Sequence, residues 1–238
     1  MKAVAVHLDQ PCPYALGLDV QQQLHQARLE DKIPDTVLFL EHTPVVTLGR
    51  RGRTEFLLTS ADALAARGID FFIASRGGDV TYHGPGQLVM YPILKFSTCE
   101  ADAHGYLANL ERIAIETAEV FGVQAYRREG MSGAWTDAGK IAAIGFYIKR
   151  WVTMHGLSFN VGPDLEGFST IIGCGLKGES VASLNHAPGA ENVTMSQVRE
   201  AMGRIFATVM QRSVDIEAAD RIADPDDIKR LLARLTKR

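Results

Sequence analysis

Cysteine is scarce in this chain, and its three copies, Cys12, Cys99 and Cys174, cannot all pair with one another. None is followed by a second cysteine at the spacing of a metal clip. Long apolar runs are also absent, since no uninterrupted stretch approaches the ~18 residues of a membrane span. The first nine residues become charged too early for a signal peptide. We therefore expect a cytoplasmic protein with free thiols and no membrane partner.

Strong charge of either sign is missing as well. Lys and Arg number 25 against 28 Asp and Glu, which gives a net charge of −3. No basic field exists to attract nucleic acid, so a nucleic-acid partner is not expected. The 238 residues are 46% hydrophobic and 22% charged, ordinary values for a globular protein. With no repeat, low-complexity tract or Pro/Ser-rich linker, the chain is expected to form one domain over residues 1–238.

Hydrophobic periodicity predicts a mixed α/β (α+β) fold. Strands are expected at 2–8, 36–40, 45–48, 69–74 (as a buried strand), 80–83, 88–94, 134–137, 141–148 and 151–161. Helices are expected at 13–30, after the cap residue Ser60, and at 102–121, 194–211 and 224–235. Strands dominate the middle without strict alternation with helices. This pattern favours a mixed sheet flanked by helices, with the C-terminal helices of about 194–238 packed on it.

Several familiar motifs are incomplete. Gly139-Lys140 lacks the glycine spacing and the Ser or Thr of a phosphate loop, because Ile141 follows the lysine. Gly84-Pro85-Gly86 lacks the third glycine of a dinucleotide fingerprint. Gly130-Met131-Ser132-Gly133 is not a nucleophile elbow. The seven histidines show no H-E-x-x-H pattern. A metal site is therefore not expected.

The densest block of chemistry-bearing residues is the segment 76–87. Its glycines permit close approach of a ligand to the main chain. Arg76 offers a forked set of donors, and His83 offers a ring that titrates near neutral pH. The alternative is a tight hairpin turn with a surface arginine and a structural histidine.

Two further residues form a chemically sensible pair. Cys174 stands between glycines, which would expose its sulfur, although a free cysteine is more often a small buried hydrophobe. Lys140 enters an apolar strand, either as an edge gatekeeper or as a partly desolvated amine. An ammonium within ~4–6 Å can lower a thiol pKa by one unit or more. Cys12 and Cys99 are expected to be structural.

Four segments then occur in a recognisable order with recognisable gaps: 76–87, 139–145, 155–160 and 173–175. Together they closely resemble the lipoyl(octanoyl) transferase family, over about Val4 to Leu184. The resemblance implies the fold of the catalytic domains of biotin and lipoate protein ligases. It also implies transfer of an octanoyl group from octanoyl-acyl-carrier protein to a lysine of a lipoyl domain. The implied acceptors are the E2 subunits of 2-oxoacid dehydrogenases and the glycine cleavage H protein.

The resemblance also assigns residues. Cys174 matches the nucleophile that carries the octanoyl thioester, and Lys140 the lysine that lowers the thiol pKa or acts as base. The implied acyl-pocket residues are Arg76, Gly77, Gly78, Asp79, Val80, Thr81, Tyr82, His83, Ala143, Ile144, Gly145, Gly156, Leu157 and Ser158. Because the donor is already a thioester, no ATP, metal or cofactor is expected.

Some details within the pocket follow from residue chemistry. Val80, Ala143, Ile144 and Leu157 are apolar and could enclose the chain. Oxyanion donors are expected around Gly77-Gly78 or Cys174-Gly175. His83 could position the acyl carbonyl or shuttle protons.

Alternatives remain open. The nearest is an ATP-dependent lipoate or biotin ligase, whose arginine- and glycine-rich loop resembles the segment 49–53. Cys174 speaks against it, since an adenylating enzyme needs no thiol there. Arg50, Arg51 and Arg53 form either a solvated loop or, as we prefer, a docking patch for acidic carrier and lipoyl domains. Further alternatives are a non-catalytic binding module and a hydrolase that uses Cys174 with His83 or His155.

Overall fold

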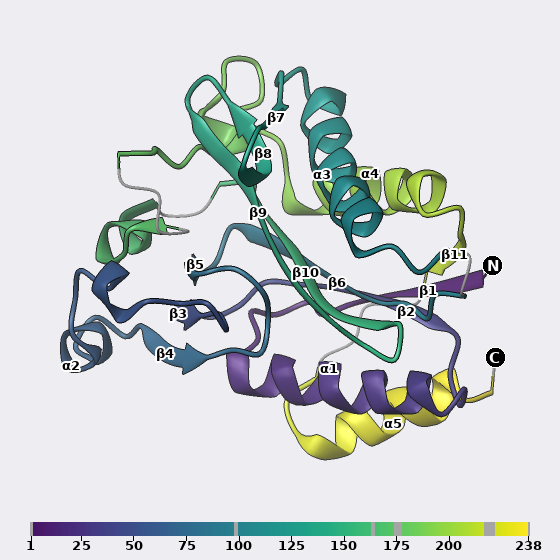
Figure 1. The fold of residues 1–238 in the computed structure, drawn as a ribbon. Helices are drawn as coiled ribbons and strands as arrows, with labels where there is room; N and C mark the ends of the chain where they lie inside the picture. The colour runs from purple at the N-terminus through teal and green to yellow at the C-terminus, as the bar shows by residue number, and fades with distance from the viewer. Residues whose placement is uncertain (1, 98–99, 163–164, 174–177, 217–221, 238) are drawn as a thin grey trace.

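A computed structural model describes residues 2–97, 100–162, 165–173, 178–216 and 222–237. Its main feature is an eight-stranded sheet in the order β11-β1-β2-β6-β10-β9-β8-β7 (Figure 1). The strands are β1 (Lys2–His7), β2 (Asp35–Leu40), β6 (Gln87–Ile93), β7 (Tyr126–Arg128), β8 (Met131–Thr136), β9 (Gly139–Lys149), β10 (Val152–Asn160) and β11 (Ser213–Ile216). β1 runs parallel to both β2 and β11, and the other pairs are antiparallel, so the sheet is mixed.

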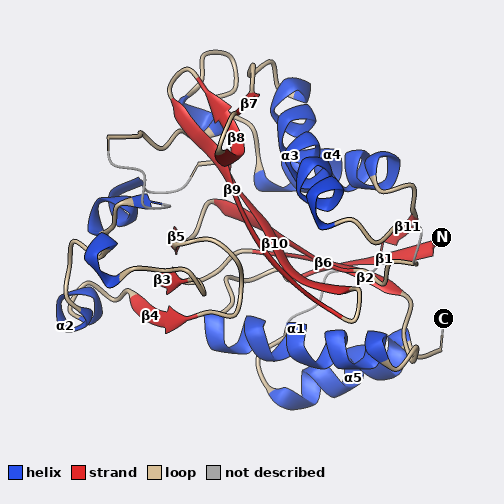
Figure 2. Cartoon of the chain, in the orientation of Figure 1, coloured by secondary structure: helices blue, strands red, loops and turns tan. Residues whose placement is uncertain are grey.

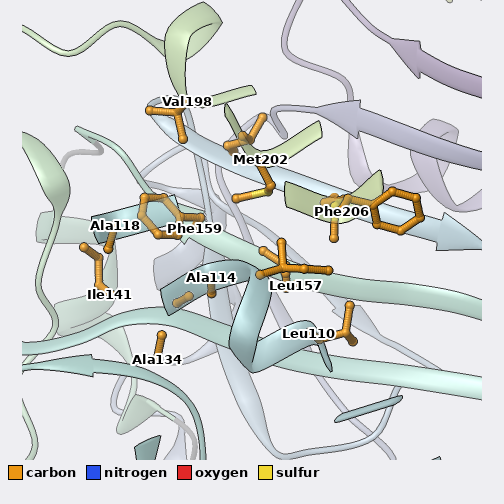
Figure 3. Packing of buried hydrophobic residues seen from close by; sticks show 14 of the residues in the cluster. Leu110, Ala114, Ala118, Ala134, Ile141, Leu157, Phe159, Val198, Met202 and Phe206 are labelled. Carbon is orange, nitrogen blue, oxygen red and sulfur yellow. The ribbon is translucent and has the colours of Figure 1, made fainter. Parts of the chain in front are cut away.

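Helices cover both faces of this sheet (Figures 1 and 2). One face carries α3 (Ala103–Val120) and α4 (Met195–Val209), and the other carries α1 (Tyr14–Leu29) and α5 (Pro225–Leu235). Because side chains alternate along a strand, each strand contributes to the apolar core on both faces of the sheet. In β10, Leu157 and Phe159 pack under α3 and α4 (Figure 3), whereas Val152 and Met154 pack on the side of α1 and α5.

A second, three-stranded sheet lies beside the first, in the order β4-β3-β5. It contains β3 (Val45–Leu48), β4 (Asp70–Ile73) and β5 (Val80–His83), and the short helix α2 (Ala61–Ala65) precedes β4. Three 3-10 turns, η1 (Thr54–Phe56), η2 (Leu165–Thr170) and η4 (Leu184–His186), complete the described elements. Val46, Val80 and Ile171 belong to the apolar cluster of this smaller sheet.

The helix boundaries follow local hydrogen bonding. Ser60 Oγ accepts from the Ala63 N–H at the start of α2, as its position before the helix predicts. Thr194 and Gln197 form a reciprocal capping box at α4. Asp224 caps α5 with Pro225 at the first helical position. α4 packs on α3, and α5 packs on α1.

The expected mixed sheet flanked by helices is confirmed, with three differences in detail. The short strands β7 and β11 were not predicted. The prediction of a buried strand at 69–74 was wrong about burial, because β4 is an edge strand and Ile73 is 76% exposed. Gly84-Pro85-Gly86 is not a hairpin turn, since β5 and β6 belong to different sheets. The single domain over 1–238 stays a prediction.

Within the described ranges, no helix combines the length and the apolar character needed to cross a bilayer.

Candidate active site

A cavity of about 320 Å³ opens where the two sheets meet. Most of the residues predicted for the acyl pocket line it, although they come from distant parts of the chain. They are Arg76, Gly78, Asp79, Val80, Thr81, His83, Ala143, Ile144, Gly145, Gly156, Leu157 and Ser158, and the predicted catalytic Lys140 lines it too. Arg51, Arg53, Tyr91 and the segment 130–132 complete the wall. The volume is at the small end of the ~300–1,000 Å³ typical of small-molecule sites.

A smaller cavity of about 30 Å³ lies next to the first. Thr81, Lys140, Ala143 and Ser158 line both cavities. Gly173 lines the smaller one, and the predicted nucleophile Cys174 follows it directly but lies outside the described residues. Lys140 is therefore shared by the two cavities.

The antiparallel pairing of β8 with β9 positions Lys140. Its cross-strand partner is Trp135, and the Lys140 Nζ lies 4.7 Å from the centroid of the Trp135 ring. The Arg128 guanidinium lies 4.4 Å from the same ring and is paired with Glu179 at 2.7 Å. A buried aromatic face attracts cations by about 0.5–2 kcal/mol. Trp135 thus holds the Lys140 ammonium in place. Lys140 is only 9% exposed.

The Arg76 guanidinium is bonded to the protein itself. Nη2 donates to the carbonyl and hydroxyl oxygens of Thr47, both at 2.7 Å. Nη1 donates to the carbonyl oxygens of Asp79 and Gly77 at 2.8 and 3.0 Å. Arg76 therefore organises the loop 76–79 from inside, although it also lines the cavity.

Gly77 and Tyr82 are the two predicted pocket residues that do not line the cavity. The Gly77 N–H donates to the Phe146 carbonyl at 2.9 Å, which removes it as an oxyanion donor. A Cβ on Gly145 would lie 2.9 Å from the Gly77 carbonyl oxygen, so glycine allows the loop to approach β9. Tyr82 instead packs edge-on against Phe168, with ring centroids 5.2 Å apart.

Three buried histidines lie at the cavity wall: His83 lines the cavity, His42 lies beside His83, and His155 lies beside Tyr91. Burial is the main cause that lowers the pKa of His83 to about 3, and electrostatic repulsion from His42, were both rings protonated, is the second. Burial lowers the pKa of His42 to about 4 and, together with Arg76, that of His155 to about 3. All three rings are thus neutral at physiological pH.

Buried His42 links Cys12 to the cavity wall. Its Nδ1 lies 2.9 Å from the Cys12 carbonyl oxygen, and its Nε2 lies 2.8 Å from the Tyr91 hydroxyl. Because a carbonyl only accepts, Nδ1 donates and Nε2 accepts from Tyr91. Burial raises the pKa of the Cys12 thiol to about 11, so this cysteine is structural, as expected.

Sequence reasoning missed Trp135, Tyr91 and His42. Trp135 had a usable signal, since the two-residue turn at 137–138 sets the register that places it opposite Lys140. His42 and Tyr91 meet across the fold, and no local pattern relates them. The role of each predicted site residue stays a prediction. Within the part of the chain that the structure describes, no three His, Cys, Asp or Glu groups gather as a metal site.

The sequence matches known proteins over most of its length. Residues 13–207 match the family model of the lipoyl protein ligase A/B catalytic domain. An octanoyltransferase of Caldicellulosiruptor bescii is 41% identical over 213 residues, covering 89% of this chain and 93% of that protein. An octanoyltransferase of Solibacter usitatus is 43% identical over 196 residues, covering 82% of this chain and 88% of the relative.

Solved structures share the fold at low sequence identity. A bipartite lipoate protein ligase from Thermoplasma acidophilum, studied with its E2 lipoyl domain, superposes with a TM-score of 0.73 at 16% identity, covering 100% of this chain and 92% of that one. A lipoate-protein ligase A bound with ATP gives a TM-score of 0.73 at 15% identity, covering 100% and 95%. The neighbours establish the fold, and the sequence relatives decide the family. The chain belongs to the octanoyltransferases of the lipoyl protein ligase A/B catalytic-domain family.

Proposed function

We propose that this protein moves an octanoyl group from octanoyl-acyl-carrier protein to a lysine of a lipoyl domain, through a thioester on Cys174. The observation that carries the mechanism is the place of Lys140, which lines two adjacent cavities, the smaller of which is also lined by Gly173. Relatives named octanoyltransferase, at 41–43% identity, support the acyl group and the reaction class.

The reaction proceeds in two thioester-consuming steps. The Cys174 thiolate attacks the donor carbonyl, a new C–S bond forms, the C–S bond to the carrier breaks, and the carrier sulfur takes up the proton that Cys174 lost. The lysine amine of the lipoyl domain then attacks the enzyme thioester, the C–N bond forms, the C–S bond to Cys174 breaks, and one amine proton passes to the Cys174 sulfur. Because thioester exchange is nearly balanced and amide formation is downhill, no ATP or metal is required. Lys140 keeps the thiol ionised or accepts its proton.

The cavity wall is part apolar and part polar. Val80, Ala143, Ile144 and Leu157 are among its lining residues, next to polar residues such as Thr81 and Ser158. Burying the chain of an octanoyl group contributes about 5 kcal/mol at ~0.8 kcal/mol per methylene. That is enough to hold the acyl group while its carrier departs.

Two arginines of the predicted docking patch, Arg51 and Arg53, line the cavity. The Arg53 side chain is 66% exposed and pairs with Glu55 at 3.2 Å. The Asp79 carboxylate accepts the Arg53 backbone N–H at 3.0 Å and fixes this segment against the loop 76–79. We propose that these arginines receive acyl carrier protein, and then E2 lipoyl domains and the glycine cleavage H protein.

Intact-mass spectrometry tests the thioester. After incubation with octanoyl-acyl-carrier protein, the enzyme should gain one octanoyl group that hydroxylamine removes. Cys174→Ala should gain none, whereas Cys12→Ala is the matched control and should still be acylated, because Cys12 is buried. Acylation of Cys174→Ala at an equal rate, or release of free octanoate as fast as transfer, would contradict the proposal.

A further inference from the structure

A relay of hydrogen bonds with one possible direction ends at His83. Asn160 Nδ2 lies 2.9 Å from the Ala182 carbonyl oxygen, which only accepts. The amide oxygen of Asn160 therefore faces Gln87 and accepts from its Nε2 at 2.9 Å. The same Nε2 lies 3.4 Å from the Tyr82 carbonyl oxygen, a second fixed acceptor.

The direction of this relay determines the tautomer of His83. With Gln87 Nε2 committed as donor, Gln87 Oε1 is the atom that lies 2.6 Å from His83 Nδ1. An amide oxygen only accepts, so Nδ1 carries the proton and Nε2 carries the lone pair. Gln87 and Asn160 are 2% and 4% exposed, which keeps water from competing for these bonds.

The remaining nitrogen belongs to a residue that lines the cavity. His83 lines the 320 Å³ cavity, whereas Gln87 lines the smaller one, on the side of Asn160. Tyr91 also lines the larger cavity and uses its hydroxyl proton on His42. His83 Nε2 and the Tyr91 hydroxyl oxygen are thus acceptors among the lining residues, whereas Lys140, Arg51 and Arg53 are lining residues that carry positive charge.

We propose that His83 Nε2 accepts a hydrogen bond from the amine of the acceptor lysine during amide formation. This inference rests on the proposed function and adds a positioning role for Gln87 and Asn160. One amine N–H points at Nε2, which turns the nitrogen lone pair toward the thioester carbonyl. The C–N bond forms, the C–S bond breaks, and the proton lost by nitrogen ends on the departing sulfur. His83 stays neutral throughout.

The tautomer can be tested without any activity measurement. Long-range proton–nitrogen correlation on protein labelled with ¹⁵N-histidine should show a protonated Nδ1 and an unprotonated Nε2 at His83, assigned from the signals lost in His83→Leu. Gln87→Met should abolish this pattern. Gln21→Met is a matched control, because Gln21 is also fully buried but its Oε1 accepts from the backbone N–H of His155 and bonds no histidine ring. It should leave the His83 tautomer unchanged. A proton on Nε2 in the wild type would overturn the proposal.

Separate half-reactions test the role. His83→Leu should form the octanoyl-enzyme within about threefold of the wild-type rate and transfer it to a lipoyl domain about 100-fold more slowly, as expected for a misplaced nucleophile. Gln87→Met should slow transfer about tenfold through kcat with KM unchanged, the effect of one lost hydrogen bond. Equal slowing of both half-reactions would overturn the assignment to amide formation. Failure of the wild type to form any octanoyl-enzyme would instead contradict the proposed function and leave the tautomer result standing.

Discussion

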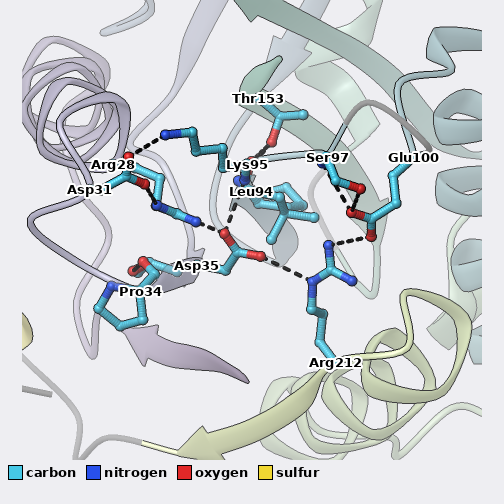
Figure 4. Close-up of polar contacts among 12 residues, drawn as sticks. Arg28, Asp31, Pro34, Asp35, Leu94, Lys95, Ser97, Glu100, Thr153 and Arg212 are labelled. Atoms are coloured by element: carbon cyan, nitrogen blue, oxygen red, sulfur yellow. Dashed lines mark hydrogen bonds and ion pairs between the residues drawn. The ribbon is translucent and has the colours of Figure 1, made fainter. Parts of the chain in front are cut away.

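Two buried polar regions of this molecule are built on opposite principles. Around Asp35, charges are paired (Figure 4): its carboxylate accepts from Arg28 Nε at 2.8 Å and Arg212 Nε at 3.0 Å, and also from the backbone N–H of Lys95 at 3.0 Å. Arg212 also donates to Glu100 at 2.9 Å. At the cavity wall, by contrast, His42, His83 and His155 are buried as neutral rings. Oxygen acceptors fix the ring proton of His42 and of His83 on Nδ1.

The difference separates stability from function. The Asp35 carboxylate and the Arg212 guanidinium are bonded to each other and to their neighbours, so they join β2 to the segments that follow β6 and α4. The histidine region is fixed from behind by carbonyl oxygens and presents residues to the cavity. Paired charges suit a contact that only joins two segments, whereas neutral groups whose donors and acceptors are fixed suit a site that must bind a substrate.

Acid should affect the neutral region most. The pKa values of these three histidines are lowered to about 3–4 in the folded state from 6.5 when unfolded. Below pH 6.5 the unfolded chain therefore binds protons that the native rings refuse, and stability falls until the folded pKa values are reached. We expect a loss on the order of 5 kcal/mol between pH 7 and pH 5.

Urea unfolding across this pH range measures the acid effect. His155→Gln should remove about a third of it. A free energy of unfolding that is constant from pH 7 to pH 5 would show that the rings are not held neutral.

Removing the Asp35 carboxylate should lower the free energy of unfolding nearly as much as acid does. Asp35→Ala leaves the buried Arg212 without its main partner. We expect the free energy of unfolding to fall by about 3–5 kcal/mol, the usual cost of breaking a buried ion pair. Chemical denaturation at pH 7 measures the loss, and octanoyl transfer by the folded fraction should persist. Loss of transfer without loss of stability would contradict the division between the two regions.

Substitution of Lys140 tests the proposed link between this cavity and Cys174. If its ammonium keeps Cys174 ionised, Lys140→Ala should move the pH midpoint of Cys174 alkylation upward by about one unit or more. Arg128→Met is the matched control, since it removes the other cation on Trp135. It should move the midpoint less. An alkylation profile unchanged in Lys140→Ala would contradict this role.

Breaking an exposed ion pair should change the free energy of unfolding least. Arg204 and Glu200 form an ion pair on α4, with both side chains more than 60% exposed. Arg204→Ala should change the free energy of unfolding by no more than about 0.5 kcal/mol. A loss comparable with that of Asp35→Ala would mean that burial does not explain the difference between the regions.

Much of this organisation is written locally in the sequence. Alternation of apolar and polar residues predicts β1, and an apolar, β-branched run predicts β2. The cap residues Ser60 and Asp224 mark helix starts because their side chains bond the first N–H groups. β11 escaped prediction, since its four residues gain order only by pairing with β1. The exposure of β4 escaped too, because an apolar run does not reveal whether its strand is central or at an edge.

The candidate site divides in the same way. Residues in continuous motifs, such as His83 and Lys140, stand out by their neighbours in the chain. The contacts that orient them join distant segments: Asn160 reaches Gln87 across 73 positions, and His42 reaches Tyr91 across 49. Such contacts depend on the register of strands that only the folded sheet establishes.

The most direct test of the account is the mass of a lipoyl domain incubated with this enzyme and octanoyl-acyl-carrier protein in the absence of ATP. The account predicts that the domain gains one octanoyl group and that the gain depends on Cys174. If the domain is modified only when free octanoate and ATP are supplied, with release of pyrophosphate, the protein is a ligase and the account is wrong.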